Sequence, residues 1–187
     1  MLITMKHIIP HALAGAAILA LGACAGTPDL RDYAQATPTL ALEEFFDGHV
    51  VAHGIFQDRF GELRRSFKVD VVGVWDGETL ILTEDFVYED ASTERRVWTL
   101  TKTGPDTWTG TAPGVIGTAM GEEAGNAFNW RYTIDLPVPD GVLRANFDDW
   151  MWQLDEQVLI NRAYVSKYGV EIGQLSITFR RDTPLGG

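Results

Sequence analysis

Most of the chain has a hydrophobic pattern with a period of two residues. From His49 onward, short runs in which apolar and polar side chains alternate are separated by turn residues. In one such run Phe67 and Val69 share a parity, and Asp76-Gly77 follows as a hairpin signal. This period is typical of strands that bury one face, so we predict nine or ten strands and no long helix.

The turns between these strands are short, as at residues 104–106 and 139–141, where Gly, Pro and Asp cluster. Sequential strands joined by tight turns form an antiparallel meander. A long meander with one apolar face closes or folds double, because open sheet edges aggregate. We predict a single all-β domain over residues 45–183, an antiparallel up-and-down β-barrel that resembles lipocalins and calycins. A β-sandwich is the alternative.

Two charged residues fall at positions that this alternation turns inward. Glu84 shares the parity of Leu82 and Phe86, and Arg96 shares that of Trp98 on the next strand. A hairpin turn near residue 90 places Glu84 opposite Arg96. A bare carboxylate inside a barrel is costly, so we expect a partner. The pair is either a buried structural ion pair or a site where Arg96 holds a ligand carboxylate that Glu84 positions.

Aromatic side chains are abundant, with 6 Trp, 5 Tyr and 9 Phe. Inward aromatic residues can fill a small barrel, or they can line an apolar ligand cavity with a few placed polar groups. The sequence leaves both possibilities open. The residues that we expect around a ligand are Glu84, Tyr88, Arg96, Trp98, Trp130 and Tyr132.

Other polar residues give weaker signals. Asp148 and Asp149 are neighbours on a strand and point to opposite faces, so we expect a rim or turn position, or pairing with an arginine. His49 and His53 share a face but lie about 13 Å apart, too far to ligate one metal. We predict no metal site, no cofactor and no catalytic cluster.

The start of the chain has the order of a bacterial signal peptide. Lys6 precedes an apolar run over residues 12–21, which is shorter than the about 20 residues that span a bilayer. Leu21-Gly22-Ala23-Cys24 follows and resembles the bacterial lipobox, which implies cleavage after residue 23 and lipidation of Cys24. We predict a signal peptide at residues 1–23 and a lipidated tether at residues 24–44.

The predicted location is the bacterial cell envelope. Ala25 follows the cysteine, and by analogy with known sorting signals this favours the outer membrane, facing the periplasm. The chain has 15 Lys and Arg against 26 Asp and Glu, a net charge of −11. An acidic chain is a poor partner for nucleic acid, because phosphate binding needs a basic surface. Membrane attachment is therefore expected through the lipid anchor.

Several short sequence segments resemble those of a family of bacterial lipoproteins, domain of unknown function 3833. They lie at residues 45–48, 73–77, 84–88, 115–119, 125–130 and 148–151. The similarity extends over almost all of the chain after the tether. It implies a lipoprotein but no assigned activity, and the frequent location of family members near genes for fatty-acid modification implies a lipid-like ligand.

Three functions follow from these patterns. The first is a lipoprotein whose barrel binds or carries an apolar small molecule such as a fatty acyl lipid. The second is a structural or interaction lipoprotein with a filled core and an outer patch around Trp150 and Trp152. The third, an enzyme acting on a lipid-like substrate, lacks a recognisable nucleophile or acid/base cluster, and we favour the first.

Overall fold

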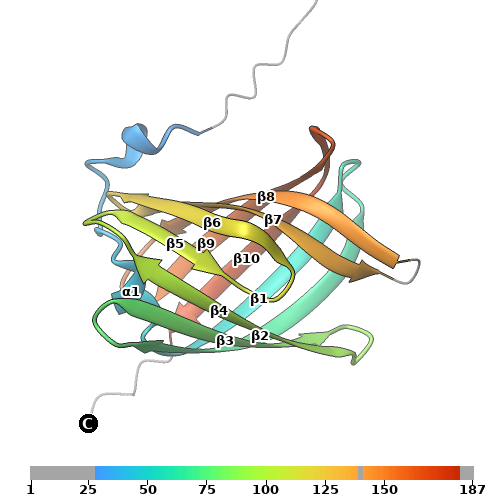
Figure 1. Cartoon of the computed structure of the whole chain (residues 1–187), viewed down its shortest axis with the longest axis horizontal. Helices are drawn as coiled ribbons and strands as arrows, with labels where there is room; N and C mark the ends of the chain where they lie inside the picture. The colour runs from blue at the N-terminus through green and yellow to red at the C-terminus, as the bar shows by residue number, and fades with distance from the viewer. Residues whose placement is uncertain (1–27, 139–140, 182–187) are drawn as a thin grey trace, which may run out of the picture.

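The computed structural model describes residues 28–138 and 141–181. Ten antiparallel strands form a closed up-and-down barrel, in which each strand pairs with its neighbours in the chain and β1 pairs with β10 (Figure 1). The strands are β1 (Gly48–Asp58), β2 (Leu63–Trp75), β3 (Thr79–Tyr88), β4 (Thr93–Lys102), β5 (Thr107–Thr111), β6 (Val115–Ala124), β7 (Ala127–Val138), β8 (Gly141–Gln153), β9 (Val158–Lys167) and β10 (Val170–Arg181). The predicted barrel is confirmed, and the sandwich alternative is wrong.

The two-residue period reappears in the burial of the strands. In β2, Val69 and Val71 are buried, whereas Val72 and Val74, which have the opposite parity, are exposed on the outer wall. Closure of the sheet gives every strand two partners, so no long edge is left to pair with another chain. The inward side chains form the core and the lining of the lumen.

β6 is a strand that the two-residue pattern did not mark. It carries Gly117 at φ +72°, and its register with β7 shifts between Ile116 and Met120. A residue with positive φ inside a strand is typical of a β-bulge, which interrupts the alternation of faces. This glycine-rich run is therefore a strand, although its side chains do not alternate cleanly.

One end of the barrel is capped by the short helix α1 (Leu42–Phe46), as Figure 1 shows. Leu42, Phe45 and Phe46 are buried, and the Phe46 ring packs edge-on against Phe179 at 5.4 Å. The Leu42 backbone N–H donates to the Glu123 carboxylate at 2.7 Å. We call this the capped end. The opposite end, bounded by the β1–β2, β3–β4 and β9–β10 turns and by the ends of β7 and β8, is the mouth.

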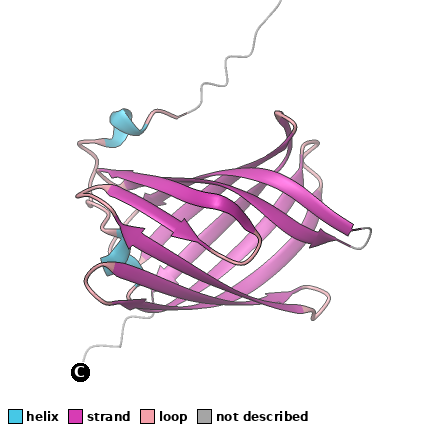
Figure 2. Cartoon of the chain, viewed as in Figure 1, coloured by secondary structure: helices cyan, strands magenta, loops and turns pink. Residues whose placement is uncertain are grey.

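A second short helix, η1 (Leu30–Tyr33), packs on the outer wall near β6 and β7. Figure 2 shows that both helices of the described chain precede the first strand. The Tyr33 ring lies 6.3 Å from Trp150 and 6.1 Å from Trp152, and Trp150 is buried. The helix η1 thus covers the outer patch expected at these tryptophans. This helix belongs to the part of the chain for which the sequence predicts a tether.

Candidate functional site

The barrel encloses a cavity of about 380 Å³. Leu42 and Phe46 of α1 form its base, and its walls come from β1 to β4 and β7 to β10. The lining residues that are exposed to solvent lie at the mouth, and they are Arg65, Glu94, Pro137 and Val138. The cavity therefore opens at the mouth and is sealed at the capped end. The lumen contains space that its side chains do not fill.

All six residues that the sequence placed around a ligand line this cavity: Glu84, Tyr88, Arg96, Trp98, Trp130 and Tyr132. They come from β3, β4 and β7, whose alternation turns these positions inward. Whether they contact a ligand stays a prediction.

The aromatic members of this set form one packed surface. The Trp98 ring contacts Trp130 at 5.7 Å and Tyr132 at 5.0 Å, both close to edge-on. Tyr132 in turn stacks on Phe147 at 5.0 Å with an interplanar angle of 9°. Such offset and edge-on pairs stabilise one another beyond the area they bury. They hold large flat faces in fixed positions along the cavity wall.

Glu84 and Arg96 are directly opposite each other in the register of β3 and β4, as expected. The direct ion pair between them is not formed among the described residues. The Arg96 guanidinium instead donates to the Glu94 carboxylate at 2.6 Å. Glu94 lies two positions nearer the mouth on the same face, where both charges keep more of their hydration.

The surroundings of Glu84 shift its protonation. Burial raises the pKa of Glu84 to about 7, and Arg96 opposes this rise while Glu94 adds to it. Burial alone would lower the pKa of Arg96, but the carboxylates of Glu84 and Glu94 raise it above its ordinary value. Arg96 is therefore a permanent cation, whereas Glu84 gains and loses its proton near neutral pH.

A further residue of the site is Asp149, which the sequence analysis placed at a rim or turn. The structure places it in the middle of β8, facing the lumen and only 8 % exposed. The Tyr132 hydroxyl donates to its Oδ2 at 3.5 Å, and its Oδ1 is buried without a hydrogen-bond partner among the described residues. Asp149 shares the parity of Phe147 and Met151, which is the signal that would have found it.

The adjacent Asp148 points outward and behaves as expected of a partner for an arginine. Its Oδ1 accepts from the Arg131 side chain at 3.1 Å and from Asn129 at 2.7 Å.

Burial raises the pKa of Asp149 to about 8, and the Asp148 carboxylate adds to that rise. Burial also raises the pKa of Tyr132 well above its usual range, with Asp149 as the next cause.

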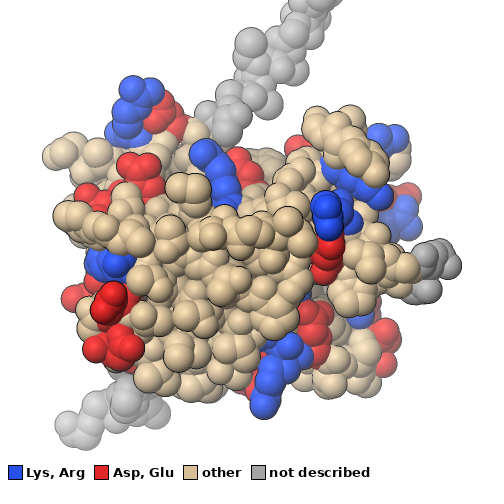
Figure 3. Space-filling view, viewed as in Figure 1, with Lys and Arg blue, Asp and Glu red and all other residues tan. Residues whose placement is uncertain are grey.

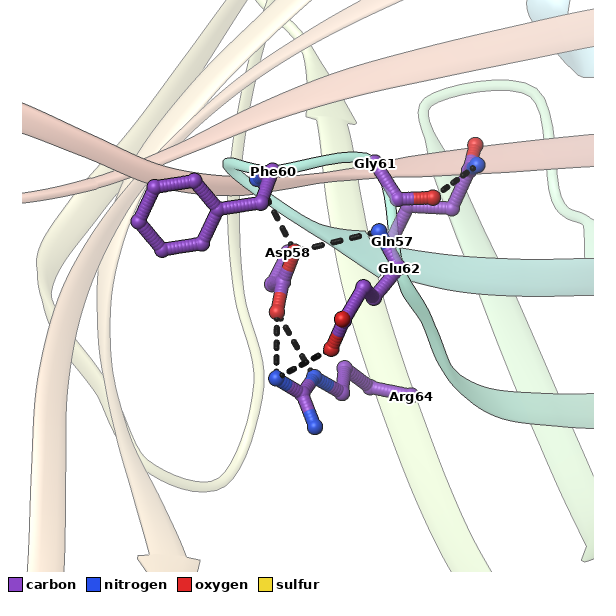
Figure 4. A network of polar contacts seen from close by, with 6 residues as sticks. All are labelled: Gln57, Asp58, Phe60, Gly61, Glu62 and Arg64. Atoms are coloured by element: carbon purple, nitrogen blue, oxygen red, sulfur yellow. Dashed lines mark hydrogen bonds and ion pairs between the residues drawn. The ribbon is translucent and has the colours of Figure 1, made fainter.

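The mouth is held by ordered turns. In the β1–β2 turn, Asp58 accepts from the backbone N–H groups of Phe60 and Glu62 and from the Arg64 side chain at 2.7 Å (Figure 4). At the β3–β4 turn, the Tyr88 hydroxyl donates to the carboxylate of Glu94 at 2.8 Å. A carboxylate that bonds several backbone donors fixes a turn. These contacts give the mouth a defined shape.

The outer wall over β4 to β6 carries few charges, and Figure 3 shows this face bounded by charged residues at its margins. Val97, Ile116 and Met120 are exposed there.

Across the described ranges, no three His, Cys, Asp or Glu side chains are grouped as metal ligands would be. His49 and His53 lie on the outer face of β1. No described helix is long and apolar enough to span a bilayer.

A closed antiparallel barrel with a lumen that opens at one end is a fold of the calycin and lipocalin-like type. More specifically, the chain belongs to the family described as protein of unknown function (DUF3833), whose profile matches residues 18–181. A search of curated proteins found no significant match. The predicted signal peptide, and with it Cys24, lies outside the described residues.

One solved structure supports the fold. The chain is similar to the S-type phycobiliprotein lyase CPES from Guillardia theta, with a TM-score of 0.57 and 12% identity over 78% of this chain and 94% of that one. It is less similar to a redesigned β-barrel, b11L5F_LGL, with a TM-score of 0.41 and 10% identity over 75% and 95% of the two chains. EF1p2_mFAP2b bound to DFHBI gives 0.42 and 10% over 76% and 100%. At these identities the likeness to the lyase shows a shared fold alone, and the other two carry no argument.

Proposed function

We propose that this protein binds a small, mainly apolar molecule inside its barrel, and that it does so as a lipid-anchored protein of the bacterial envelope. The observation that carries the proposal is the cavity of about 380 Å³, sealed by α1 and open at the mouth. Its size falls within the range of about 300–1,000 Å³ that is usual for small-molecule sites.

The lining has the composition of a ligand site. Apolar and aromatic side chains form most of the surface, and the lumen holds a small set of polar groups at Glu84, Arg96, Tyr132 and Asp149. Apolar walls supply affinity through burial of ligand surface, and a few polar groups fix the orientation of the ligand. A core that only stabilised the fold would gain nothing from this empty space, because cavities in a core cost stability.

The experiment is mass spectrometry of organic extracts from the protein purified from a bacterial periplasm under native conditions. A version with residues 25–187 is suitable, because it includes the ten described strands, α1 and the docked helix η1. We expect an apolar molecule in stoichiometric amount. An acidic periplasmic protein purified in the same way is the control. A folded protein that yields no such molecule, and that binds no neutral apolar dye such as Nile red, would overturn the proposal.

The lipid anchor is tested separately. The family match begins at residue 18 and so includes Leu21-Gly22-Ala23-Cys24, which supports a shared lipidation motif. We expect the full chain to incorporate labelled palmitate in a bacterial host and to fractionate with the outer membrane. The Cys24→Ala variant should lose the label. Equal labelling of the two chains would show that Cys24 is not the modified residue.

A further inference from the structure

Asp149 carries the strongest sign of a missing partner in the lumen. Its side chain is more than nine-tenths buried, faces the cavity, and leaves Oδ1 without a hydrogen bond among the described residues. A buried oxygen without a donor costs free energy, and native proteins leave few such atoms. The carboxyl of Asp149 accepts one long hydrogen bond, from the Tyr132 hydroxyl to Oδ2. No group of the described chain therefore donates a hydrogen bond to Oδ1 of Asp149.

The titratable groups around Asp149 also include more acids than bases. Glu84 faces the same lumen, and its carboxylate disfavours the ionisation of Asp149. Arg96 is the cation next to them, but it is bonded to Glu94 on the side of the mouth. Tyr132 is the remaining titratable group at this level and stays neutral because burial raises its pKa. The middle of the lumen thus has an excess of acid over base.

Aromatic faces surround this acidic level. Trp98 packs edge-on against both Trp130 and Tyr132, and Phe147 stacks on Tyr132. The face of an aromatic ring attracts a cation, most strongly in a site removed from water. Carboxyls and aromatic faces together are a combination that recognises positively charged nitrogen.

On the basis of the proposed function, we propose that the lumen takes an apolar molecule bearing a protonated amine, whose nitrogen donates to the carboxyls of Asp149 and Glu84. The ammonium group supplies the donor that Asp149 lacks, and its charge lowers the pKa of both carboxyls, so that they are ionised when the amine is bound. The apolar part lies against Leu82, Phe128 and the cap. A fatty acid fits this lumen poorly, because its carboxylate would meet two acidic groups and an arginine that already has a partner.

The test uses three probes that differ only in their head group: decylamine, decanol and decanoic acid. Their binding to residues 25–187 is measured by isothermal titration calorimetry at pH 7.5. We expect decylamine to bind at least about tenfold more tightly than decanol, and decanoic acid to bind most weakly. This order isolates the head group, since the apolar chain is constant.

Two substitutions place the nitrogen. Asp149→Asn and Glu84→Gln should each weaken decylamine binding by about tenfold and leave decanol binding within about threefold. The matched controls are Asp148→Asn and Asp85→Asn, which neutralise the adjacent carboxylates on the outer wall. Asp148 bonds Arg131 and Asp85 bonds Arg95, away from the lumen. Asp85→Asn should bind decylamine like the unchanged protein, and Asp148→Asn, which also removes a carboxylate that raises the pKa of Asp149, should stay within about threefold of it.

The outcomes separate this inference from the proposed function. Decanol and decylamine binding with equal affinity, or decanoic acid binding best, overturns the amine while leaving a ligand-binding barrel. Failure of all three probes and of Nile red to bind overturns both. If Asp149→Asn fails to fold, Glu84→Gln with its control Asp85→Asn gives the same decision.

Discussion

Asp149 and Glu84 keep their protons to higher pH than the same residues in an unfolded chain. Burial raises the pKa of Asp149 to about 8 and that of Glu84 to about 7. Below about pH 4 each carboxyl is protonated in both states. Between that pH and the raised pKa the unfolded chain ionises its carboxyls while the folded protein does not, so folding takes up protons.

We therefore predict that the stability of the ligand-free protein falls as the pH rises from 5.5 to 8.5. Ionisation favours the unfolded chain until each raised pKa is passed, and Glu84 alone contributes a loss of roughly 2 kcal/mol across this window. Urea unfolding at a series of pH values measures it. The slope should be smaller in Asp149→Asn and in Glu84→Gln. An unchanged slope in both variants would show that neither carboxyl titrates as the geometry indicates.

At the residue scale the sequence predicted directions better than partners. Strand parity turned Glu84 and Arg96 inward and opposite each other, because parity depends only on position. It did not predict that Arg96 bonds Glu94, since that choice depends on the path of a long side chain and on hydration. The sequence placed Asp148 and Asp149 on opposite faces of a strand but assigned neither to the lumen, which Asp149 faces.

At the scale of elements, α1 depends on a close approach of backbone to backbone. A Cβ added at Gly73 of β2 would lie 1.8 Å from the carbonyl oxygen of Phe46. The Trp75 N–H also donates to Asp47 directly after the helix, at 3.2 Å. Only glycine at position 73 lets the helix lie this deep in the end of the barrel.

We predict that Gly73→Ala displaces α1 and destabilises the protein by about 3 kcal/mol, the upper part of the usual range for an overpacked core. Chemical unfolding measures the loss, and hydrogen exchange should show reduced protection in Leu42–Phe46. Val74→Ala is the control, because that side chain is 58% exposed on the outer wall. It should change stability by about 0.5 kcal/mol or less. Equal effects of the two changes would mean that the cap does not need the glycine.

The elements with regular alternation were predictable from sequence, and the others were not. On β3 and β7 the residues that the sequence turned inward share one parity, and Glu84, Tyr88, Trp130 and Tyr132 among them line the lumen. β6 was unclear because its bulge breaks the period. The docking of Tyr33 on Trp150 had no periodic signal, since it depends on contacts between segments far apart in the chain.

At the scale of the whole molecule, the number of strands explains the lumen. An eight-stranded barrel is just wide enough for side chains to fill, and the diameter grows with the number of strands. Ten strands therefore leave space even among tryptophans. The sequence predicted closure from the tight turns, but it could not decide between a filled core and a cavity, because that depends on the final circumference.

We predict that a chain ending at Lys167, without β10, does not fold cooperatively. Removal of β10 opens the barrel, leaves β1 and β9 with unpaired edges, and removes Phe179 from the contacts with α1. Circular dichroism during thermal unfolding measures it, with residues 25–187 as the reference. A sharp transition in the shortened chain would contradict a core that depends on closure.

The cap has a consequence for any traffic of small molecules. With Leu42, Phe45 and Phe46 sealing one end, a molecule leaves by the way it entered. Delivery to a second protein then requires that protein to face the mouth, where Arg65 and Glu94 stand at the rim. The described lumen opens at one end, so uptake and release of a ligand take place through the same mouth.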